Sequence, residues 1–310
     1  MASDVRFWVI APRDDAEDRA AQARDIVEKV ASSCTRFDPQ SALMQANAAG
    51  RRWHEVPREC YDAIVAARDA HVTTGGLFDP RVLKALTSYG YDTSLPFESR
   101  RLALPATRAS GGTRARRAWK PKFDESRLAV KVGSEPLDLG GIGKGLAMRW
   151  AASRLRGAGE SALVEAGGDL MALGGGPEGT GWMVAVESPS SGLDTVGADP
   201  AAVLRLRDRA CATSSIRIRS WTVGETEVHH IIDPRTGRSA ASDLLSVTVV
   251  GLDPAMAEVW SKSLFVVGRA GIREAAATRN LAALWVDSEG RVGVSRAMRP
   301  FVAWQVNRVS

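Results

Sequence analysis

The chain has 310 residues, of which 45% are hydrophobic and 25% charged, and this composition excludes disordered, collagen-like and coiled-coil proteins. Its formal net charge of +5 at pH 7 and pI near 9.4 favour anionic partners, and a phosphate-bearing small molecule satisfies that preference as well as a nucleic acid does. The three cysteines, Cys34, Cys60 and Cys211, lie far apart, which argues against a disulfide framework or structural zinc and favours a reducing compartment.

Two features of the chain bear on its location. The first residues, Met1–Arg6, lead directly into a short alternating segment, with no apolar signal-peptide core before them. The longest apolar stretches, such as Leu244–Leu252, are far shorter than the roughly 20 residues that a membrane-spanning helix needs. We therefore expect a cytoplasmic protein without a transmembrane segment. The sequence leaves the oligomeric state open, a homodimer included.

The first third of the chain predicts a strand followed by helices, because apolar residues first alternate and then recur on one helical face. The expected elements are a strand over Phe7–Ile10 and helices over 15–33, over 41–47 and from Pro57 to a glycine-rich break at 73–80. Basic residues and glycines then accumulate over 100–122 with little apolar patterning. This composition predicts an exposed basic loop.

Strands predominate in the rest of the chain. The patterns predict strands over 128–132, 162–164, 182–186, 204–206 and 244–250, helices over 146–155 and 254–267, and a closing hairpin over 282–294. Strands and helices do not alternate regularly. The order therefore predicts an α+β fold with a mixed, mostly antiparallel sheet and flanking helices, and not a βαβ series.

A glycine-rich segment, Gly140–Gly145, leads into the predicted helix at 146–155. Unhindered backbone N–H groups and Lys144 at a helix N-terminus suit a phosphate or pyrophosphate. Gly145 follows Lys144 where a Walker A loop has Ser or Thr, and the glycine spacing differs from that of the Rossmann fold. From this segment alone, anion binding and close packing of the helix are equally good explanations.

Other polar motifs have simpler structural explanations. Gly167-Gly168-Asp169 is a tight turn after a strand, and the run His229–Gly237 could hold a metal, supply a base or turn a hairpin, of which the hairpin is favoured. Glu258 and Lys262 stand four residues apart on a predicted helix, the spacing of an exposed ion pair. The basic cluster Arg114–Arg117 favours a solvated loop over a nucleic-acid site.

Taken together and in this order, these motifs resemble the ApbE-like family of FAD:protein FMN transferases across nearly the whole chain. The segments that carry the resemblance are Arg36–Asn47, Thr74–Pro80, Asp138–Gly145, Ala166–Asp169, Ala212–Ser214, His230–Gly237 and Ala257–Gly268. The resemblance implies one domain over residues 1–310 with the T-fold of that family and a FAD cleft between a main body and a smaller lobe. It also implies transfer of the FMN phosphoryl group from FAD to a threonine hydroxyl of a flavoprotein, with release of AMP. Two alternatives stay open: a FAD-binding protein with lost or weak transfer activity, and a FAD pyrophosphatase.

The resemblance also implies roles for individual residues. His230, Asp233 and Lys144 would be catalytic, with His230 near the reacting phosphate as a candidate base. The residues implied in binding FAD are Asn47, Leu77, Phe78, Asp79, Asp138, Gly140, Gly141, Lys144, Gly167, Gly168, Asp169, Thr213, Ile232 and Thr236. The acceptor would be a threonine-bearing flavoprotein, and no nucleic acid is expected.

The sequence departs from the family pattern at the magnesium site. The resemblance assigns Gly141, Glu258 and Ser261 to the metal, but Lys262 stands where the family has a threonine ligand. A charged ammonium group is a donor and cannot coordinate a hard cation. This substitution makes Mg²⁺ uncertain and suggests the hypothesis that the Lys262 ammonium, paired with Glu258, replaces the ion.

Overall fold

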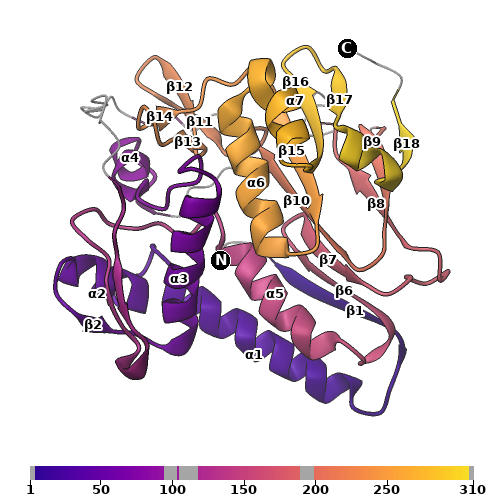
Figure 1. The fold of residues 1–310 in the computed structure, drawn as a ribbon, viewed down its shortest axis with the longest axis horizontal. Coiled ribbons are helices and arrows are strands. Elements are labelled where there is room, and N and C mark those ends of the chain that lie inside the picture. The colour runs from indigo at the N-terminus through magenta and orange to yellow at the C-terminus, as the bar shows by residue number, and fades with distance from the viewer. Residues whose placement is uncertain (1–3, 94–102, 105–117, 189–198, 307–310) are drawn as a thin grey trace. The chain divides into compact units, whose positions relative to one another are not determined.

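The computed structural model describes residues 4–93, 103–104, 118–188 and 199–306 (Figure 1). The chain divides into two compact units. Unit 1 comprises Met1–Ala2, Glu28–Gly143 and Ile218–Ala240, and unit 2 comprises Ser3–Val27, Lys144–Arg217 and Ala241–Ser310. The long helix α1 (Ala16–Cys34) begins in unit 2 and ends in unit 1.

A seven-stranded sheet forms the centre of unit 2, in the order β1-β6-β7-β10-β15-β16-β17. Its strands are β1 (Val5–Pro12), β6 (Gly159–Ala166), β7 (Asp169–Leu173), β10 (Arg209–Ser215), β15 (Leu244–Gly251), β16 (Ala282–Asp287) and β17 (Val292–Val294). Every neighbouring pair in it is antiparallel. The antiparallel α+β fold predicted from the element order is thus confirmed.

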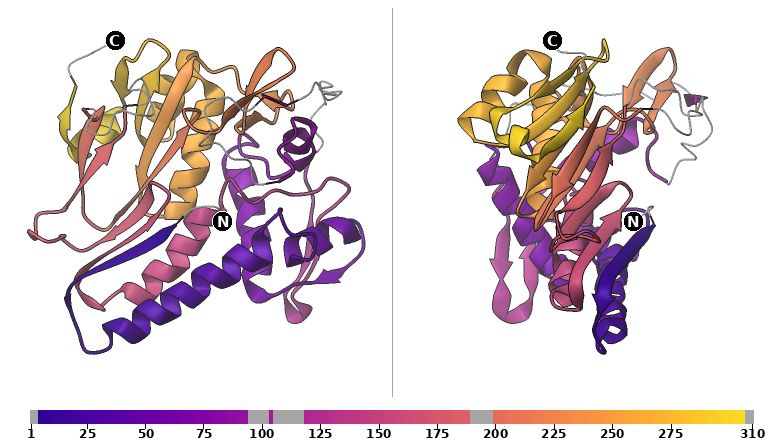
Figure 2. Two further views of the ribbon diagram at one scale, coloured as in Figure 1. Left: turned by 180° about the vertical axis from the view of Figure 1, so that it is seen from behind. Right: turned by 90° about the vertical axis from the view of Figure 1, so that its right-hand side faces the viewer.

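Helices cover this sheet, and the views in Figure 2 show them from behind and from the side. They are α5 (Gly143–Leu155), α6 (Pro254–Val267) and α7 (Arg269–Thr278). Helix α6 packs on β10 and β15. It begins where the sequence predicts, because the Asp253 side chain accepts from the N–H groups of Ala255 and Met256 and Pro254 occupies the first turn.

A second sheet of unit 2 has three strands, and an apolar core is formed by residues of this sheet and of the large sheet. Its strands are β8 (Trp182–Val186), β9 (Ala202–Leu206) and β18 (Val302–Gln305), and the 3₁₀ helix η2 (Arg296–Phe301) precedes β18. Leu204 and Leu206 from β9 are completely buried together with Leu284 of the large sheet. Burial of such aliphatic side chains holds the two sheets of this unit together.

Unit 1 is built from short helices and small sheets. Its helices are α2 (Ala42–Ala49), α3 (Arg58–Thr73) and α4 (Leu83–Ser88), with the 3₁₀ turn η1 (Glu125–Arg127). Its strands are β2 (His54–Glu55), β4 (Lys122–Asp124) and β5 (Ala129–Lys131), then β3 (Ala103–Leu104), β11 (Ser220–Val223) and β12 (Thr226–His229), and the hairpin β13 (Ile232–Asp233) and β14 (Arg238–Ser239).

The structure adds elements that the sequence patterns did not predict. Strands β7 and β10, both in the large sheet, were interpreted only as motif segments, because each follows a turn within a few residues. Of the predicted loop over 100–122, residues 100–102 and 105–117 lie outside the described part, as does the cluster Arg114–Arg117. Trp119, at its end, is buried and its indole N–H donates to the Val132 carbonyl at 2.9 Å. Within the described ranges, no helix is both long and apolar enough to cross a membrane.

Candidate functional site

The predicted site residues of unit 1 lie on three segments that hydrogen bonds join together. The Asn47 amide on α2 donates to the Leu137 carbonyl at 2.9 Å and accepts from the Leu137 N–H at 2.8 Å. The N–H of the next residue, Asp138, donates to the Pro80 carbonyl at 2.7 Å. The segment before Gly140 is therefore fixed on one side by α2 and on the other by the end of the Leu77–Pro80 motif.

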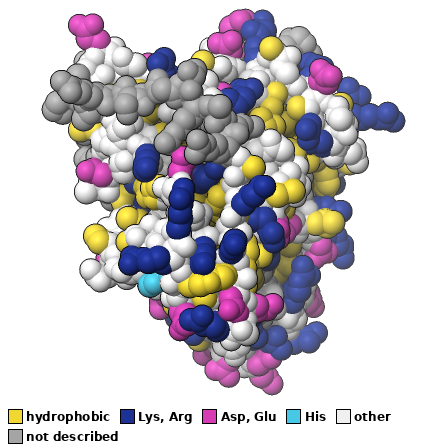
Figure 3. All heavy atoms as spheres, turned by 60° about the vertical axis from the view of Figure 1, so that its left-hand side comes forward, with side chains coloured by type: hydrophobic (Ala, Val, Ile, Leu, Met, Phe, Trp, Pro, Cys, Tyr) yellow, Lys and Arg dark blue, Asp and Glu magenta, His cyan; other side chains and the backbone are white. Residues whose placement is uncertain are grey.

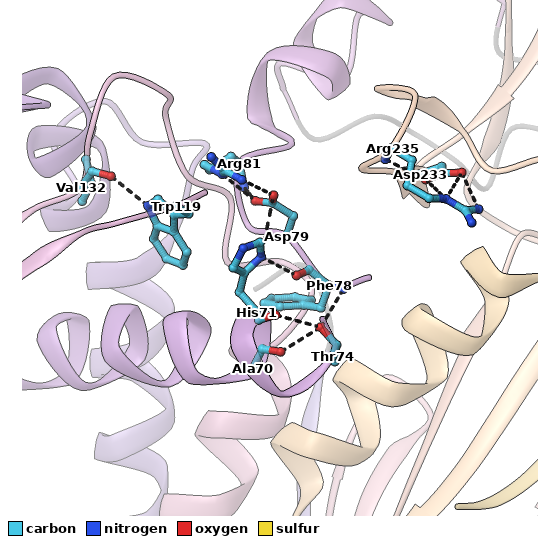
Figure 4. A network of polar contacts seen from close by, with 10 residues as sticks. All are labelled: Ala70, His71, Thr74, Phe78, Asp79, Arg81, Trp119, Val132, Asp233 and Arg235. Atoms are coloured by element: carbon cyan, nitrogen blue, oxygen red, sulfur yellow. Dashed lines mark hydrogen bonds and ion pairs between the residues drawn. The ribbon is translucent and has the colours of Figure 1, made fainter. Parts of the chain in front are cut away.

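The Leu77–Pro80 motif is held by a polar network (Figure 4). The Thr74 hydroxyl, which follows α3, accepts from the Phe78 N–H at 3.0 Å, and His71 Nδ1 lies 3.0 Å from the Phe78 carbonyl. Arg81 donates to both carboxylate oxygens of Asp79, at 2.9 and 2.6 Å. The Asp79 carboxylate therefore already has a cationic partner within the protein.

A tight turn between β13 and β14 carries the predicted residues Asp233 and Thr236. Arg235 donates Nε to Oδ1 of Asp233 at 2.9 Å and Nη2 to Oδ2 at 2.8 Å, and Figure 4 draws this pair as sticks. The N–H groups of Thr236 and Gly237 donate to the Asp233 carbonyl, with Gly237 at φ +70°. The hairpin favoured from the sequence is thus present.

The two neighbouring histidines before this turn differ in their surroundings. His229 is fully occupied as a neutral ring: its Nε2 lies 3.0 Å from the Ala240 carbonyl, and its Nδ1 accepts from the Ile231 N–H at 3.3 Å. Burial lowers the pKa of His229 below its ordinary value near 6.5. Nδ1 of His230 lies 3.3 Å from the Arg219 carbonyl. Since a carbonyl only accepts, Nδ1 carries the proton of a neutral His230, and Nε2 is its basic nitrogen.

In unit 2 the predicted Lys144, Asp169 and Thr213 form one cluster. The Lys144 ammonium at the start of α5 pairs with Oδ2 of Asp169. The other oxygen, Oδ1, accepts from the Thr213 N–H at 2.8 Å. Burial raises the pKa of the Asp169 carboxyl, while the ammonium groups of Lys144 and Lys262 oppose that rise. Asp169 therefore anchors α5 to β10 and orients the Lys144 side chain.

Glycine is needed at different positions of these motifs for different structural reasons. A Cβ on Gly145 would lie 2.4 Å from the Ala255 Cα, so this glycine permits close approach of α5 and α6. A Cβ on Gly143 would meet nothing within 4 Å. Gly167 and Gly168 have φ of +57° and +88° and form the two-residue turn between β6 and β7. Close packing therefore explains Gly145, and turn geometry explains the pair at 167–168.

The expectation of an exposed pair at Glu258 and Lys262 was wrong. The Glu258 side chain is only 1% exposed, because α6 turns this face toward α5 and the sheet. Its Oε2 accepts from the Gly145 N–H at 2.8 Å and its Oε1 from the Lys262 ammonium at 3.1 Å. Spacing along a helix predicts which side chains meet, but tertiary packing decides whether they meet in water.

The donor atoms around Glu258 do not fit a magnesium ion. Both carboxylate oxygens accept hydrogen bonds, one of them from a cation. The Ser261 hydroxyl is also occupied, since it donates to the Glu258 carbonyl at 2.9 Å and lies 2.7 Å from the Ser214 hydroxyl. No cluster of three or more potential His, Cys, Asp or Glu ligands exists within the part of the chain that the structure describes. Gly141, the remaining predicted ligand, belongs to unit 1.

Sequence reasoning missed two groups that support these residues. Arg36 forms an ion pair with Asp138, Nε to Oδ2 at 2.9 Å, in unit 1. Thr248 on β15 lies with its hydroxyl 2.9 Å from that of Thr213 in unit 2. Arg36 lies inside one of the motifs that resemble the family, so its charge beside the aromatic Phe37 could have indicated a role in the site. Thr248 stood in an apolar strand with no signal of its own.

The surface agrees with the positive charge of the sequence. On the face drawn in Figure 3, dark blue Lys and Arg side chains are scattered over the described surface. Basic groups spread in this way favour the approach of an anionic ligand without specifying it.

Comparison with known proteins identifies the family. A family model described as the ApbE family matches residues 1–285. The chain belongs to the ApbE family. The ApbE protein of Thermotoga maritima has a solved structure that superposes with a TM-score of 0.78 at 27% identity, covering 96% of each chain. The flavin transferase ApbE of Vibrio cholerae superposes with a TM-score of 0.75 at 21% identity, covering 97% of this chain and 96% of that one, and shows the fold alone.

Two curated relatives of the chain are both named FAD:protein FMN transferase. The FAD:protein FMN transferase of Escherichia coli K12 is 30% identical over 155 residues, which span 50% of this chain and 43% of the relative. The FAD:protein FMN transferase of Klebsiella pneumoniae is 24% identical over 318 residues, which span 97% of this chain and 88% of the relative. The alignment with the E. coli protein thus spans less than half of that protein's length.

The packing of the ApbE glycine segment gives a stability prediction. Gly145→Ala inserts a methyl group against the backbone of Ala255 and is expected to lower the free energy of unfolding by about 1–3 kcal/mol, the usual cost of overpacking. Gly143→Ala, two residues away in open space, is the matched control and is expected to change it by less than about 1 kcal/mol. Urea denaturation of the two variants measures the difference. Equal effects would refute the packing explanation.

The buried His229 gives a pH prediction. Because its folded pKa is lower than 6.5, the unfolded chain binds more protons, and the stabilisation it provides is present above pH 6.5 and lost as pH falls through the folded pKa. His229→Gln keeps a donor for Ala240 but cannot titrate. The free energy of unfolding lost in this variant should therefore be largest near pH 7.5 and shrink toward pH 5, as measured by urea denaturation across that range. A difference that does not change with pH would contradict the assignment.

Proposed function

We propose that this protein is a FAD:protein FMN transferase that moves the FMN phosphoryl group of FAD to a threonine hydroxyl of a flavoprotein. The observation that carries the proposal is the ApbE family match over residues 1–285, with relatives that bear this name. Because that match includes residues of both compact units, it also supports treating them as parts of one domain. A flavoprotein segment with an accessible threonine is the proposed acceptor.

The proposed reaction is a single phosphoryl transfer. The threonine oxygen attacks the phosphorus of the FMN half of FAD and forms a phosphoester bond. The bond between that phosphorus and the bridging oxygen breaks, and AMP leaves with the bridging oxygen and its electron pair. The threonine proton passes to a base. Negative charge grows on the leaving phosphate, so positive groups held in place before the reaction lower the barrier.

Lys144 is the proposed source of that positive charge. Its ammonium is held at the N-terminus of α5 by the buried Asp169, and Asp169 is in turn held by the Thr213 N–H. Such an orienting partner reduces the reorganisation that the lysine would need during the reaction. Gly167 and Gly168 would shape the neighbouring wall through their turn.

His230 is the proposed base, acting through Nε2. Its contact with the Arg219 carbonyl fixes the tautomer in which this nitrogen can accept a proton. Asp233 is proposed to lie near the reacting phosphate, with its charge offset by Arg235. That pairing supports an orienting role for Asp233, because a carboxylate without a cation would repel the pyrophosphate.

The proposed FAD contacts of unit 1 share one structural property: they lie on segments that side-chain hydrogen bonds, ion pairs or buried packing hold in place. They are Asn47, Leu77, Phe78, Asp79, Asp138, Gly140, Gly141, Ile232 and Thr236. Ile232 is buried in an apolar cluster with Tyr91 and Trp221. A site held in this way before FAD arrives loses little conformational entropy on binding.

We propose that Lys262 replaces the magnesium ion of the family. Its ammonium is bonded to Glu258, and its charge also acts on Asp169. Lys144 and Lys262 together supply two positive charges, which balance the two carboxylates of Asp169 and Glu258. A lysine supplies fixed positive charge but no Lewis-acid coordination, so its expected contribution is electrostatic.

The metal proposal predicts transfer without a divalent cation. AMP release by the wild type should be unchanged after treatment with a chelator, and Mn²⁺ titrated into it should show no stoichiometric binding by electron paramagnetic resonance. The double variant Glu258→Asp with Lys262→Thr frees the carboxylate from the ammonium and puts the family's threonine ligand at 262, so it should bind Mn²⁺ and require a divalent cation for transfer. Lys84→Thr, on the exposed side of α4, is the control. Stoichiometric Mn²⁺ binding by the wild type that Glu258→Gln abolishes would overturn the proposal.

The transferase proposal itself is tested with FAD and a protein domain that carries an acceptor threonine. AMP release is followed by chromatography and the acceptor by mass spectrometry, and the expected result is one FMN phosphoryl group added per acceptor. Lys144→Ala should lower the rate at least about a hundredfold, the usual scale for loss of a charge-stabilising group. AMP and free FMN with an unmodified acceptor would indicate FAD hydrolysis, and FAD binding without AMP would indicate a binding protein.

A further inference from the structure

Arg36, just after α1 in unit 1, has a buried guanidinium group packed against two aromatic rings. Its side chain is only 7% exposed. Its Cζ lies 4.2 Å from the centroid of the Phe37 ring and 4.2 Å from that of the Tyr91 ring. Trp221 extends this aromatic wall, with its ring 5.4 Å from that of Tyr91. The rings of Phe37 and Tyr91, tilted by 53° to each other, restrict the positions that the guanidinium can adopt.

Two of the three guanidinium nitrogens have partners in the protein. Nε lies 2.9 Å from Oδ2 of Asp138, and Nη1 donates to the Tyr91 carbonyl at 2.5 Å. Among the described residues, the third nitrogen, Nη2, is buried and has no hydrogen-bond partner. Burying a charged donor without an acceptor is costly. Elsewhere in the described part of the chain, Arg68 and Arg291 also have an unpartnered nitrogen, but their side chains are 40% and 30% exposed, whereas that of Arg36 is 7% exposed. The nitrogen of Arg36 is therefore the one that calls for an acceptor atom on a ligand.

The charges and rings around Nη2 indicate the kind of acceptor. Asp138 neutralises Arg36, so the pair carries no net charge with which to attract a second anion. A neutral acceptor, such as a ring carbonyl or imine nitrogen, suits it better than a phosphate. Phe37 is 38% exposed as a residue, and its ring lies beside the guanidinium. These features fit the edge of a planar heterocycle.

We propose that Arg36 recognises one of the two heteroaromatic rings of the donor dinucleotide, with Nη2 donating to an acceptor on the ring edge. The inference rests on the proposed function, since FAD carries both an isoalloxazine and an adenine ring. The same residue fixes Asp138, whose Oδ1 accepts from the Gly140 N–H. Arg36 is thereby both a binding group and a positioning residue for the glycine segment.

The test compares the two halves of FAD as separate ligands. Dissociation constants for FAD, FMN and ADP are measured by calorimetry with the wild type, Arg36→Lys and Arg36→Met. Lysine keeps a positive charge beside Asp138 but lacks the planar, forked set of N–H donors of a guanidinium. Methionine keeps only the apolar part of the side chain. Arg58→Met removes an exposed arginine that pairs with Asp62 in the same unit and is the matched control. Melting temperatures report any general loss of structure.

Both Arg36 variants are expected to lose affinity for FAD by about ten- to a hundredfold, the scale of one hydrogen bond from a charged donor. The same loss should appear for only one of the halves: for FMN if the flavin is recognised, for ADP if the adenine is. Equal losses for both halves in step with the melting temperature, or no loss in a folded variant, would overturn the proposal. A wild type that binds none of the three ligands would refute the proposed function, and this inference with it.

Discussion

Two buried carboxylates in unit 2 require positive partners, and the local arrangement of helices and strands depends on that requirement. Asp169 and Glu258 are 2% and 1% exposed, and an ionised carboxylate buried without a partner costs several kcal/mol. Lys144 and Lys262 supply the charge, and the Gly145 N–H supplies a further donor to Glu258. The Lys144–Asp169 ion pair therefore joins the start of α5 to the start of β7, and the hydrogen bond from the Gly145 N–H to Glu258 joins α5 to α6.

The same constraint applies to the acidic residues of unit 1. Asp79, Asp138 and Asp233 each have an arginine partner, and in each case the carboxylate also accepts a backbone N–H. A carboxylate committed in this way organises the loop that carries it. Such a residue is poorly suited to hold a metal ion, because its oxygens are already used. Of these three pairs, only Arg36 with Asp138 retains a buried donor, Nη2, without a hydrogen-bond partner among the described residues.

Much of the fold could be predicted from the sequence because its signals are local. Helix α6 begins at Pro254 and ends at Val267 as predicted, since an Asp cap, a proline in the first turn and a following glycine act within one helical turn. Strand β7 directly follows β6 through the Gly167-Gly168 turn and was missed because that segment was interpreted only as a turn. Strand β10 was missed because its pairing partners, β7 and β15, lie far away in the chain. The pairing of Cys211 in β10 with Leu170 in β7 cannot be deduced from either segment alone.

The sequence by itself determined the family, through motifs that occur in one order, and determined which charged residues those motifs contain. Only the tertiary structure decided what those charges meet. Glu258 and Lys262 have the spacing of a solvent-exposed pair, yet packing of α6 against the sheet buries the carboxylate and directs its second oxygen to the Gly145 N–H. The physical reason is that spacing along a helix fixes neighbours on one element, whereas burial and the resulting cost of an unpaired charge depend on elements distant in sequence.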